Sequence, residues 1–297
     1  MTAPSAVAVA RTTTRRMSES AGRRAVRRFL RHRAALAGML VLALIAFAAV
    51  FGPIIYGHDP DVTDLSNGFT SPNSNQWLGA DSLGRDLLAR LLVAGRVSLS
   101  VGLAAAFSAT FLGLVVGLLA GTFGGWVDTI LMRLTDITLA LPTLIAVAVV
   151  VGIVGPSLGI IVLFIGLFQW PEAARVVRSV VLSLREQDFV LAARALGSTN
   201  GRIIRKHLIF HALAPLTVTG TFTVAIALLT EASLSFIGIG IAPPQASWGN
   251  MLADAEQLFI LREYIWYWLP PGIAIFVTVL SVNLVGDGLR DALDPHG

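Results

Sequence analysis

The sequence predicts an all-α polytopic membrane protein with six transmembrane helices and with both its N- and C-termini cytoplasmic. Hydrophobic residues make up 55% of the 297 residues, and charged residues make up only 13%. A soluble domain carries about 25% charged residues, so this chain has too few to cover a water-exposed globule. Six long apolar runs and an uneven distribution of arginine complete the prediction.

Each apolar run is close to the roughly 20 residues that a membrane-spanning helix needs. The first transmembrane helix is expected at residues 34–56, after a basic cytoplasmic tail at residues 1–33. Five further spans are expected at residues 97–121, 127–154, 157–177, 212–238 and 266–286.

The connecting segments define the remaining regions. Residues 57–96 are expected to form an extracytoplasmic loop, in which Asp81 opens an amphipathic helix. This helix lies either in the membrane interface or against the helix bundle. Residues 97–286 form the membrane core, which includes a cytoplasmic hairpin at residues 178–211, and residues 287–297 form a cytoplasmic tail.

The basic residues predict the orientation, because cytoplasmic loops are enriched in Lys and Arg. With the N-terminus inside, 18 of the 22 basic residues lie in the cytoplasm, and only Arg85, Arg90, Arg96 and Arg262 lie outside. With an odd number of spans, basic segments would move to the outer side and this uneven distribution of Lys and Arg would be lost. The arginine-rich tail is interpreted as an anchor to anionic membrane lipid. The alternative, a nucleic-acid-binding arm, is disfavoured, and no nucleic-acid partner is expected.

The composition excludes several kinds of site. The chain has no cysteine, which excludes disulfides, cysteine zinc sites, iron–sulfur clusters and thiol nucleophiles. An ATP-binding P-loop needs a lysine followed by Ser or Thr, but Lys206 is the one lysine and His207 follows it. We therefore expect no catalytic residue, no metal site and no cofactor in this chain.

Two features of the spans predict how the helices pack. Gly113, Gly117 and Gly121 recur at a spacing of four, which lets a second helix approach closely. That second helix belongs either to this chain or to a dimer partner, and the first is favoured. Pro142 lies inside the third span and is expected to kink it.

The hairpin between the fourth and fifth spans is the most informative segment. Asp188 is suited to cap a short helix whose apolar face carries Phe189, Ala192, Ala193 and Leu196. Gly197 is expected to end that helix. Ser198 or Asn200 is expected to cap a second helix, with Ile203, Ile204 and Leu208 on its apolar side. The first helix is too short to be stable alone and needs a surface to pack on.

Residues 185–197, REQDFVLAARALG, resemble the EAA loop of bacterial ABC importer permeases. More narrowly, they resemble the C-type permease of dipeptide and oligopeptide importers. Six further blocks are similar to that family in the expected order: residues 77–86, 124–128, 131–133, 231–238, 243–249 and 286–291. The resemblance covers nearly the whole chain and implies a type I ABC importer permease fold in the bacterial plasma membrane.

Three positions depart from the family pattern. Leu191 stands where the EAA loop has its glutamate, which weakens the start of the helix. Residues 209–211 are Ile-Phe-His where the family tends to have Leu-Pro-Asn, so the bend into the fifth span is expected to be displaced. Gln76 stands where a histidine is common.

The resemblance implies that this chain is a non-catalytic permease subunit. One or two ATP-binding subunits would bind ATP and Mg²⁺, an extracytoplasmic binding protein would deliver substrate, and a second homologous permease would complete a heterodimer. The coupling residues implied are Asp188, Phe189, Ala192, Ala193, Arg194, Leu196, Gly197 and Arg202. Phe189 and Leu196 would enter a cleft on the ATPase, while Arg194 and Arg202 would reach its acidic residues.

Glu231 is the one carboxylate predicted to lie deep inside a span, where a charge is costly unless it faces a cavity or a partner. One interpretation places Glu231 and Ser235 on the translocation path. The alternative, which is favoured, is structural: Glu231 bonds a neighbouring helix with help from Ser233 and Ser235.

Three alternatives to a peptide importer are considered from the sequence. The same scaffold could import nickel, haem or glutathione, which relatives of this family carry. An ion-coupled secondary transporter is disfavoured because the spans are nearly free of charge. A membrane-embedded enzyme is disfavoured because no catalytic motif is present.

Overall fold

The computed structural model describes residues 21–293. Parts of the tails predicted at residues 1–33 and 287–297 therefore lie outside the described residues. Within residues 21–293 the chain is helical and forms no β-strand, which confirms the all-α class. The helices are α1 (Ala21–Phe29), α2 (Arg33–Tyr56), η1 (Leu65–Asn67), α3 (Leu87–Phe123), α4 (Gly125–Ala140), α5 (Thr143–Val154), α6 (Leu158–Leu184), α7 (Asp188–Ala195), α8 (Asn200–Ile203), η2 (Ile204–Leu208), α9 (Ile209–Phe236), α10 (Trp248–Ala253), α11 (Leu258–Glu263) and α12 (Ile265–Leu293).

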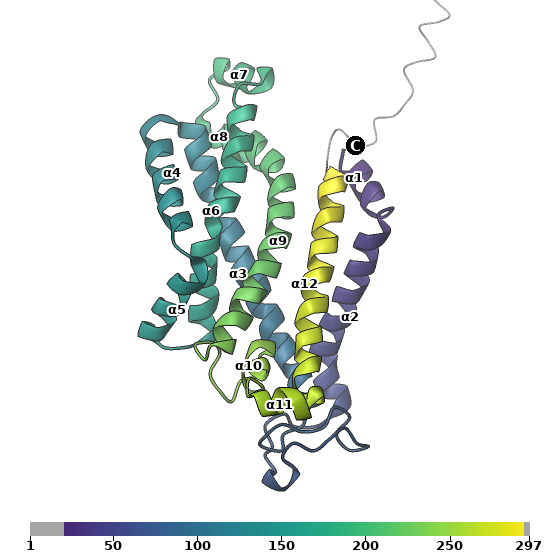
Figure 1. The fold of residues 1–297 in the computed structure, drawn as a ribbon. Helices are drawn as coiled ribbons and strands as arrows, with labels where there is room; N and C mark the ends of the chain where they lie inside the picture. The colour runs from purple at the N-terminus through teal and green to yellow at the C-terminus, as the bar shows by residue number, and fades with distance from the viewer. Residues whose placement is uncertain (1–20, 294–297) are drawn as a thin grey trace, which may run out of the picture.

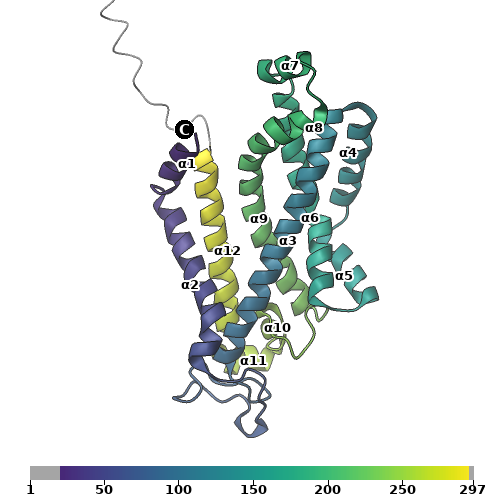
Figure 2. The same ribbon diagram turned by 180° about the vertical axis from the view of Figure 1, so that it is seen from behind.

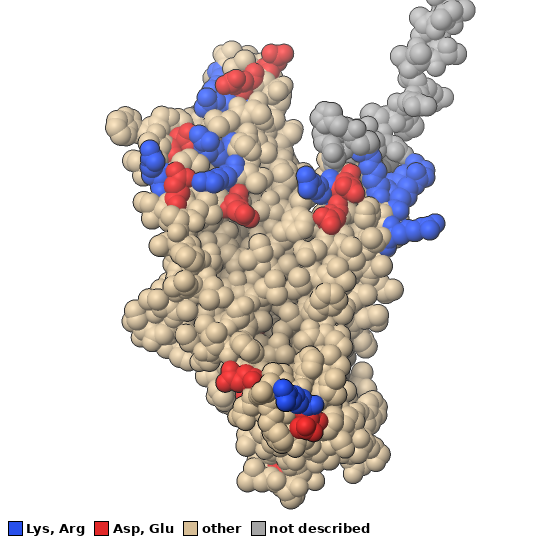
Figure 3. Space-filling view, viewed as in Figure 1, with Lys and Arg blue, Asp and Glu red and all other residues tan. Residues whose placement is uncertain are grey.

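The long helices run side by side between two ends of the molecule (Figures 1 and 2). One end carries α1, α7 and the end of α12, and we call it the hairpin end. The other carries the loop before α3 together with α10 and α11, and we call it the loop end. In the view of Figure 3, charged side chains gather near the two ends and leave the middle almost free of charge. This distribution suits a protein whose middle crosses a bilayer.

The structure contains five helices long and apolar enough to cross a membrane: α2, α3, α6, the continuous segment Asn200–Phe236, and α12. The α4–α5 pair meets the same test as a single crossing, with a bend of 85°. The six predicted spans are confirmed if this broken pair is counted as one.

The third span is broken where a kink was expected. α4 ends at Ala140, and Leu141 and Pro142 adopt extended backbone conformations before α5 begins. Proline has no N–H for the helix ladder and also disfavours helical conformation in the residue before it. Two consecutive residues therefore leave the helix, which produces the 85° bend.

The helix expected to open at Asp81 is not a separate element. Asp86 caps α3 by accepting the N–H groups of Leu88 and Ala89 at 2.9 and 3.0 Å, and α3 then continues unbroken to Phe123. The loop therefore ends at Asp86 and not at residue 96. Leu87 is buried in the core, so this amphipathic stretch packs against the bundle and does not lie free in the interface.

The three glycines at a spacing of four pack within this chain, as favoured from the sequence. Gly113, Gly117 and Gly121 all face α6. A Cβ on Gly117 would lie 2.6 Å from the carbonyl oxygen of Ala174, and one on Gly121 would lie 2.7 Å from Cβ of Val181. No flexible side-chain end can move aside to relieve these contacts, so α3 and α6 pack this closely only with glycine at these positions.

Two ion pairs hold α4 on the outer side of α6. Arg178 contacts both carboxylate oxygens of Asp128, one of them at 2.6 Å, and Arg175 contacts Asp136 at 2.6 Å. Paired guanidinium and carboxylate groups of this kind are geometrically specific. They attach the first half of the broken span to the helix that carries the hairpin.

We expect Gly117→Leu to destabilise the bundle by about 1–3 kcal/mol, because the new side chain must push α3 away from α6. Thermal unfolding in detergent measures the loss. Gly152→Leu is the matched control, since nothing lies within 4 Å of a Cβ at Gly152. Equal stability of the two variants would contradict the close approach of α3 and α6.

Candidate functional site

The predicted hairpin forms the tip of the hairpin end. α6 ends at Leu184, and α7 follows after a three-residue turn. The chain then turns back into the helical segment that begins at Asn200 and continues through α9. In both Figure 1 and Figure 2, α7 lies beyond the ends of the long helices. It is the element at this end most open to a second protein.

One buried side chain and one aromatic ring hold α7 on the bundle. Val190 is fully buried in a cluster that includes Ile203. The ring of Phe189 lies 5.7 Å from that of His207 and 6.0 Å from that of His211, measured between ring centroids. Both histidines therefore serve as packing partners of Phe189. The apolar Ile203 predicted for the second helix is confirmed as buried.

The predicted apolar face of α7 is uncovered in this chain. Leu196 is 88% exposed and Phe189 is 40% exposed, and Leu191, which lies off this face, is also exposed. Ala192 is exposed as well, and Ala193 is half-buried. Contiguous apolar surface on a protein marks an interaction site more often than scattered apolar residues do. Several of the predicted coupling residues thus share one open surface.

The start of α7 differs from the expectation that Asp188 is its cap. Gln187 is the capping residue, and no side chain bonds the helix start. The Gln187 carbonyl already accepts the N–H groups of Val190 and Leu191, which makes Asp188 the first residue of the helix. There its carboxylate lies in the first turn, where negative charge is favoured by the helix dipole.

The end of α7 follows the prediction. Gly197 has a φ of +82°, in the left-handed region that L side chains rarely adopt. Its N–H donates to the Arg194 carbonyl at 2.9 Å, and the N–H of Ser198 donates to the Ala193 carbonyl at 3.0 Å. These two bonds satisfy carbonyls that the helix end would otherwise leave free. The turn therefore depends on glycine at this position.

The second half of the hairpin is not a separate capped helix. Thr199, and neither Ser198 nor Asn200, is the capping residue of α8, and its side chain makes no capping bond. The chain passes through a five-residue π-helix, η2, directly into α9 without leaving right-handed helical conformation. The displaced bend expected at residues 209–211 stays a prediction; the irregularity observed is the π-helical segment before residue 209, a distortion often found at functional sites.

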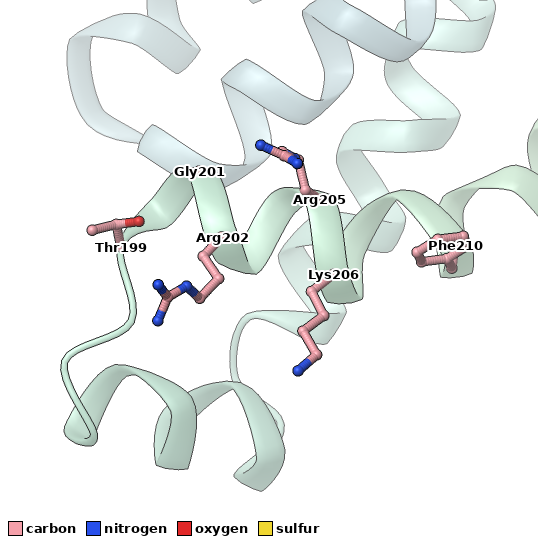
Figure 4. A pocket seen from close by; sticks show the side chains of 6 residues that line it. All are labelled: Thr199, Gly201, Arg202, Arg205, Lys206 and Phe210. Carbon is pink, nitrogen blue, oxygen red and sulfur yellow. The ribbon is translucent and has the colours of Figure 1, made fainter.

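A basic cavity lies beside the hairpin. It has a volume of about 620 Å³ and is lined by Thr199, Gly201, Arg202, Arg205, Lys206 and Phe210. Figure 4 shows Arg202 and Lys206 on the side where α7 lies, while Arg205 leaves the helix on the opposite side. Within residues 21–293, no carboxylate forms an ion pair with these three cations. They are therefore available to acidic groups outside the chain. Arg202 is among the coupling residues predicted from the sequence, but Arg205 and Lys206 are not, although they are only three and four residues further along the chain.

Glu231 lies far from this tip and is completely buried. Ser98 of α3 and Ser235 donate hydrogen bonds to its carboxylate at 3.2 and 2.8 Å. The Ser98 hydroxyl also accepts the backbone N–H of Trp248 at 3.1 Å, so the network joins α3, α9 and the start of α10. Ser233 does not take part, because its hydroxyl donates to a carbonyl of its own helix.

A second carboxylate, not predicted from the sequence, also lies inside a span. Glu172 lies near the middle of α6, within the range predicted for the fourth span. It is exposed and lines a large groove that α6 shares with α9 and α12. The sequence did carry a signal for Glu172, because Gln169 and Glu172 are two polar residues close together in an otherwise apolar run.

Comparisons with known proteins match the chain along most of its length. Residues 113–296 match the family model described as binding-protein-dependent transport system inner membrane component. Residues 20–74 match the model of the N-terminal TM domain of oligopeptide transport permease C.

Two relatives are similar across nearly the whole chain. The dipeptide transport system permease protein DppC of Alkalihalophilus pseudofirmus is 38% identical over 273 residues, which cover 92% of this chain and 89% of the relative. The oligopeptide transport system permease protein OppC of Bacillus subtilis is 38% identical over 271 residues, which cover 91% and 88%.

We expect Gly197→Ala to loosen the end of α7, because a left-handed conformation costs a residue with a Cβ about 1–2 kcal/mol. The rate of trypsin cleavage after Arg194 should rise about 5- to 30-fold, the factor that corresponds to this free energy. Gly201→Ala is the control, since Gly201 lies in α8 with open space around it. Unchanged cleavage of Gly197→Ala would contradict the role given to this turn.

Proposed function

The chain belongs to the family of inner membrane components of binding-protein-dependent transport systems, and from this premise we propose that it is the transmembrane subunit of an ATP-driven peptide importer. Relatives named as dipeptide and oligopeptide permeases support peptides as the cargo. The match of residues 20–74 to an oligopeptide permease domain supports the same cargo class. The chain would form half of the translocation pathway, and a second homologous permease would form the other half.

The energy comes from partner subunits in this proposal. The one lysine of the chain, Lys206, is followed by His207 and does not fit an ATP-binding P-loop. One or two separate ATP-binding subunits would therefore hydrolyse ATP with Mg²⁺, and this chain would be non-catalytic. An extracytoplasmic binding protein would deliver the peptide.

The arginine distribution supports the orientation. Both described ends of the chain lie at the hairpin end, together with the basic hairpin (Figures 1 and 2). The positive-inside rule then assigns the hairpin end to the cytoplasm of a bacterial plasma membrane. ATP is found on that side, so the ATP-binding subunits would meet α7 there.

The observation that carries the proposal is the uncovered apolar face of α7 at the tip of the molecule. Phe189 and Leu196 present it, and Arg194 and Arg202 are exposed on either side of the turn. We propose that this face enters a cleft on an ATP-binding subunit, with the arginines meeting acidic residues. Because Val190 anchors α7 to the ends of α6 and α9, movement of the ATPase would reach the membrane helices.

We expect Phe189→Asp to reduce co-purification of the chain with its ATP-binding subunit at least about 10-fold, because a buried aromatic anchor at an interface contributes 2 kcal/mol or more. Phe259→Asp is the matched control: Phe259 is also exposed, but it lies on α11 at the opposite end. Membrane insertion of both variants is checked by alkaline extraction. Wild-type recovery of the ATPase with Phe189→Asp would refute the coupling assignment.

For Glu231 and Ser235, the earlier assignment to the translocation path remains a prediction. We expect Glu231→Gln to lower peptide uptake about 10-fold, the effect of losing a hydrogen bond to a charged group, while leaving complex assembly nearly unchanged. Uptake in proteoliposomes and subunit recovery are measured together. An equal loss of both would favour a purely structural role, to which the Ser98 bond points.

A further inference from the structure

A large groove opens on the side of the molecule between α6, α9 and α12. Its volume is about 1190 Å³, and it reaches from the hairpin end toward the middle of these helices. In Figure 3 the surface is indented between the lobe that carries α7 and the end of α12. Most of the lining is apolar, and charge enters it through Glu172, Arg175 and Arg290.

The charge of Arg175 is already compensated, and that of Glu172 is not. Arg175 contacts Asp136 at 2.6 Å. Within residues 21–293, the Glu172 carboxylate has neither an ion pair nor a hydrogen bond, although its side chain is exposed. Glu172 lies on α6 one turn before Arg175, within the span predicted at residues 157–177 and toward the hairpin end of that span. A carboxylate inside a span is costly in lipid and is expected at a water-filled cavity or opposite a cation.

A second polar side chain lies on α6 one turn further from the hairpin end. Gln169 lies three residues before Glu172, and residues at that spacing share a helix face. Its amide nitrogen lies 3.5 Å from the hydroxyl of Thr230 on α9. Its amide oxygen is buried and has no hydrogen-bond partner among the described residues. Gln169 is therefore enclosed beside α9, and Glu172 is the acceptor that α6 presents to the groove.

We propose that Glu172 contacts the cargo in the translocation path and accepts hydrogen bonds from a protonated amine, such as the N-terminal ammonium of a peptide. This inference rests on the proposed function and names a residue that carries cargo selectivity. An ammonium group offers three donors and a full positive charge, and bonds between ionised partners are about twice as strong as neutral ones. Glu172 supplies both the acceptor oxygens and the negative charge.

The absence of cysteine from the sequence allows a direct test in the complete transporter complex. Val176 lines the groove one turn from Glu172, so Val176→Cys places a unique thiol of this chain beside the carboxylate. The probes are a cationic and an anionic methanethiosulfonate reagent of similar size. We expect both to react, and we expect added Glu172→Gln to lower the ratio of cationic to anionic rates about 5-fold, the effect of one nearby unit charge in a hydrated site.

Glu263→Gln in the same Val176→Cys background is the control, because Glu263 lies on α11 at the loop end. It should leave the rate ratio unchanged. An unreactive Val176→Cys would show that a partner chain fills the groove and would overturn the proposal. The proposal would also be overturned if Glu172→Gln left the ratio of cationic to anionic rates unchanged.

Uptake of trialanine by proteoliposomes tests the cargo contact itself. We expect Glu172→Gln to lower uptake about 10-fold with unchanged subunit recovery. Glu172→Asp keeps the negative charge, so it should restore part of the uptake. Uptake at the wild-type rate by Glu172→Gln would refute the contact. If the wild-type complex takes up no trialanine but the thiol rates behave as expected, the peptide cargo is wrong and the position of Glu172 in the path is supported.

Discussion

The close approach of α3 to α6 is the constraint on which the other features depend. Three glycines on α3 leave no space for a side chain against α6, so the two helices have little freedom to slide or separate. α6 in turn carries the hairpin at its end, holds α4 through Arg178 and Arg175, and presents Glu172 to the groove. One helix, α6, therefore positions both the proposed path along its side and the coupling surface of α7 beyond its end.

Two surfaces of the chain look incomplete when it stands alone. The tip of α7 exposes Leu196 and Phe189 to water, and the groove leaves the charge of Glu172 uncompensated. Both arrangements are unfavourable for an isolated subunit, for opposite reasons, since one exposes apolar surface to water and the other leaves an unpaired carboxylate inside a predicted span. They make sense for a subunit whose surfaces meet an ATP-binding protein and a hydrated path.

Glu231 shows the contrasting arrangement. Its carboxylate is buried, and Ser98 and Ser235 both donate to it. A buried charge with internal hydrogen bonds stiffens the structure around it, because leaving its partners unsatisfied is costly. This network connects α3 and α9 to the start of α10, and so joins the membrane core to the loop end. Two carboxylates inside spans thus occupy very different environments.

The sequence by itself determined the membrane class, six crossings, the place of the hairpin and the role of Gly197, because these depend on composition, run length and local backbone chemistry. It also identified the glycines that admit a neighbouring helix, but not which helix. The kink at Pro142 also followed from local proline chemistry. Only the tertiary structure decided that α3 runs unbroken from Leu87 and that Glu172 faces a groove while Glu231 does not. These outcomes depend on which helix faces which, and contacts between distant segments cannot be read from the periodicity of any one of them.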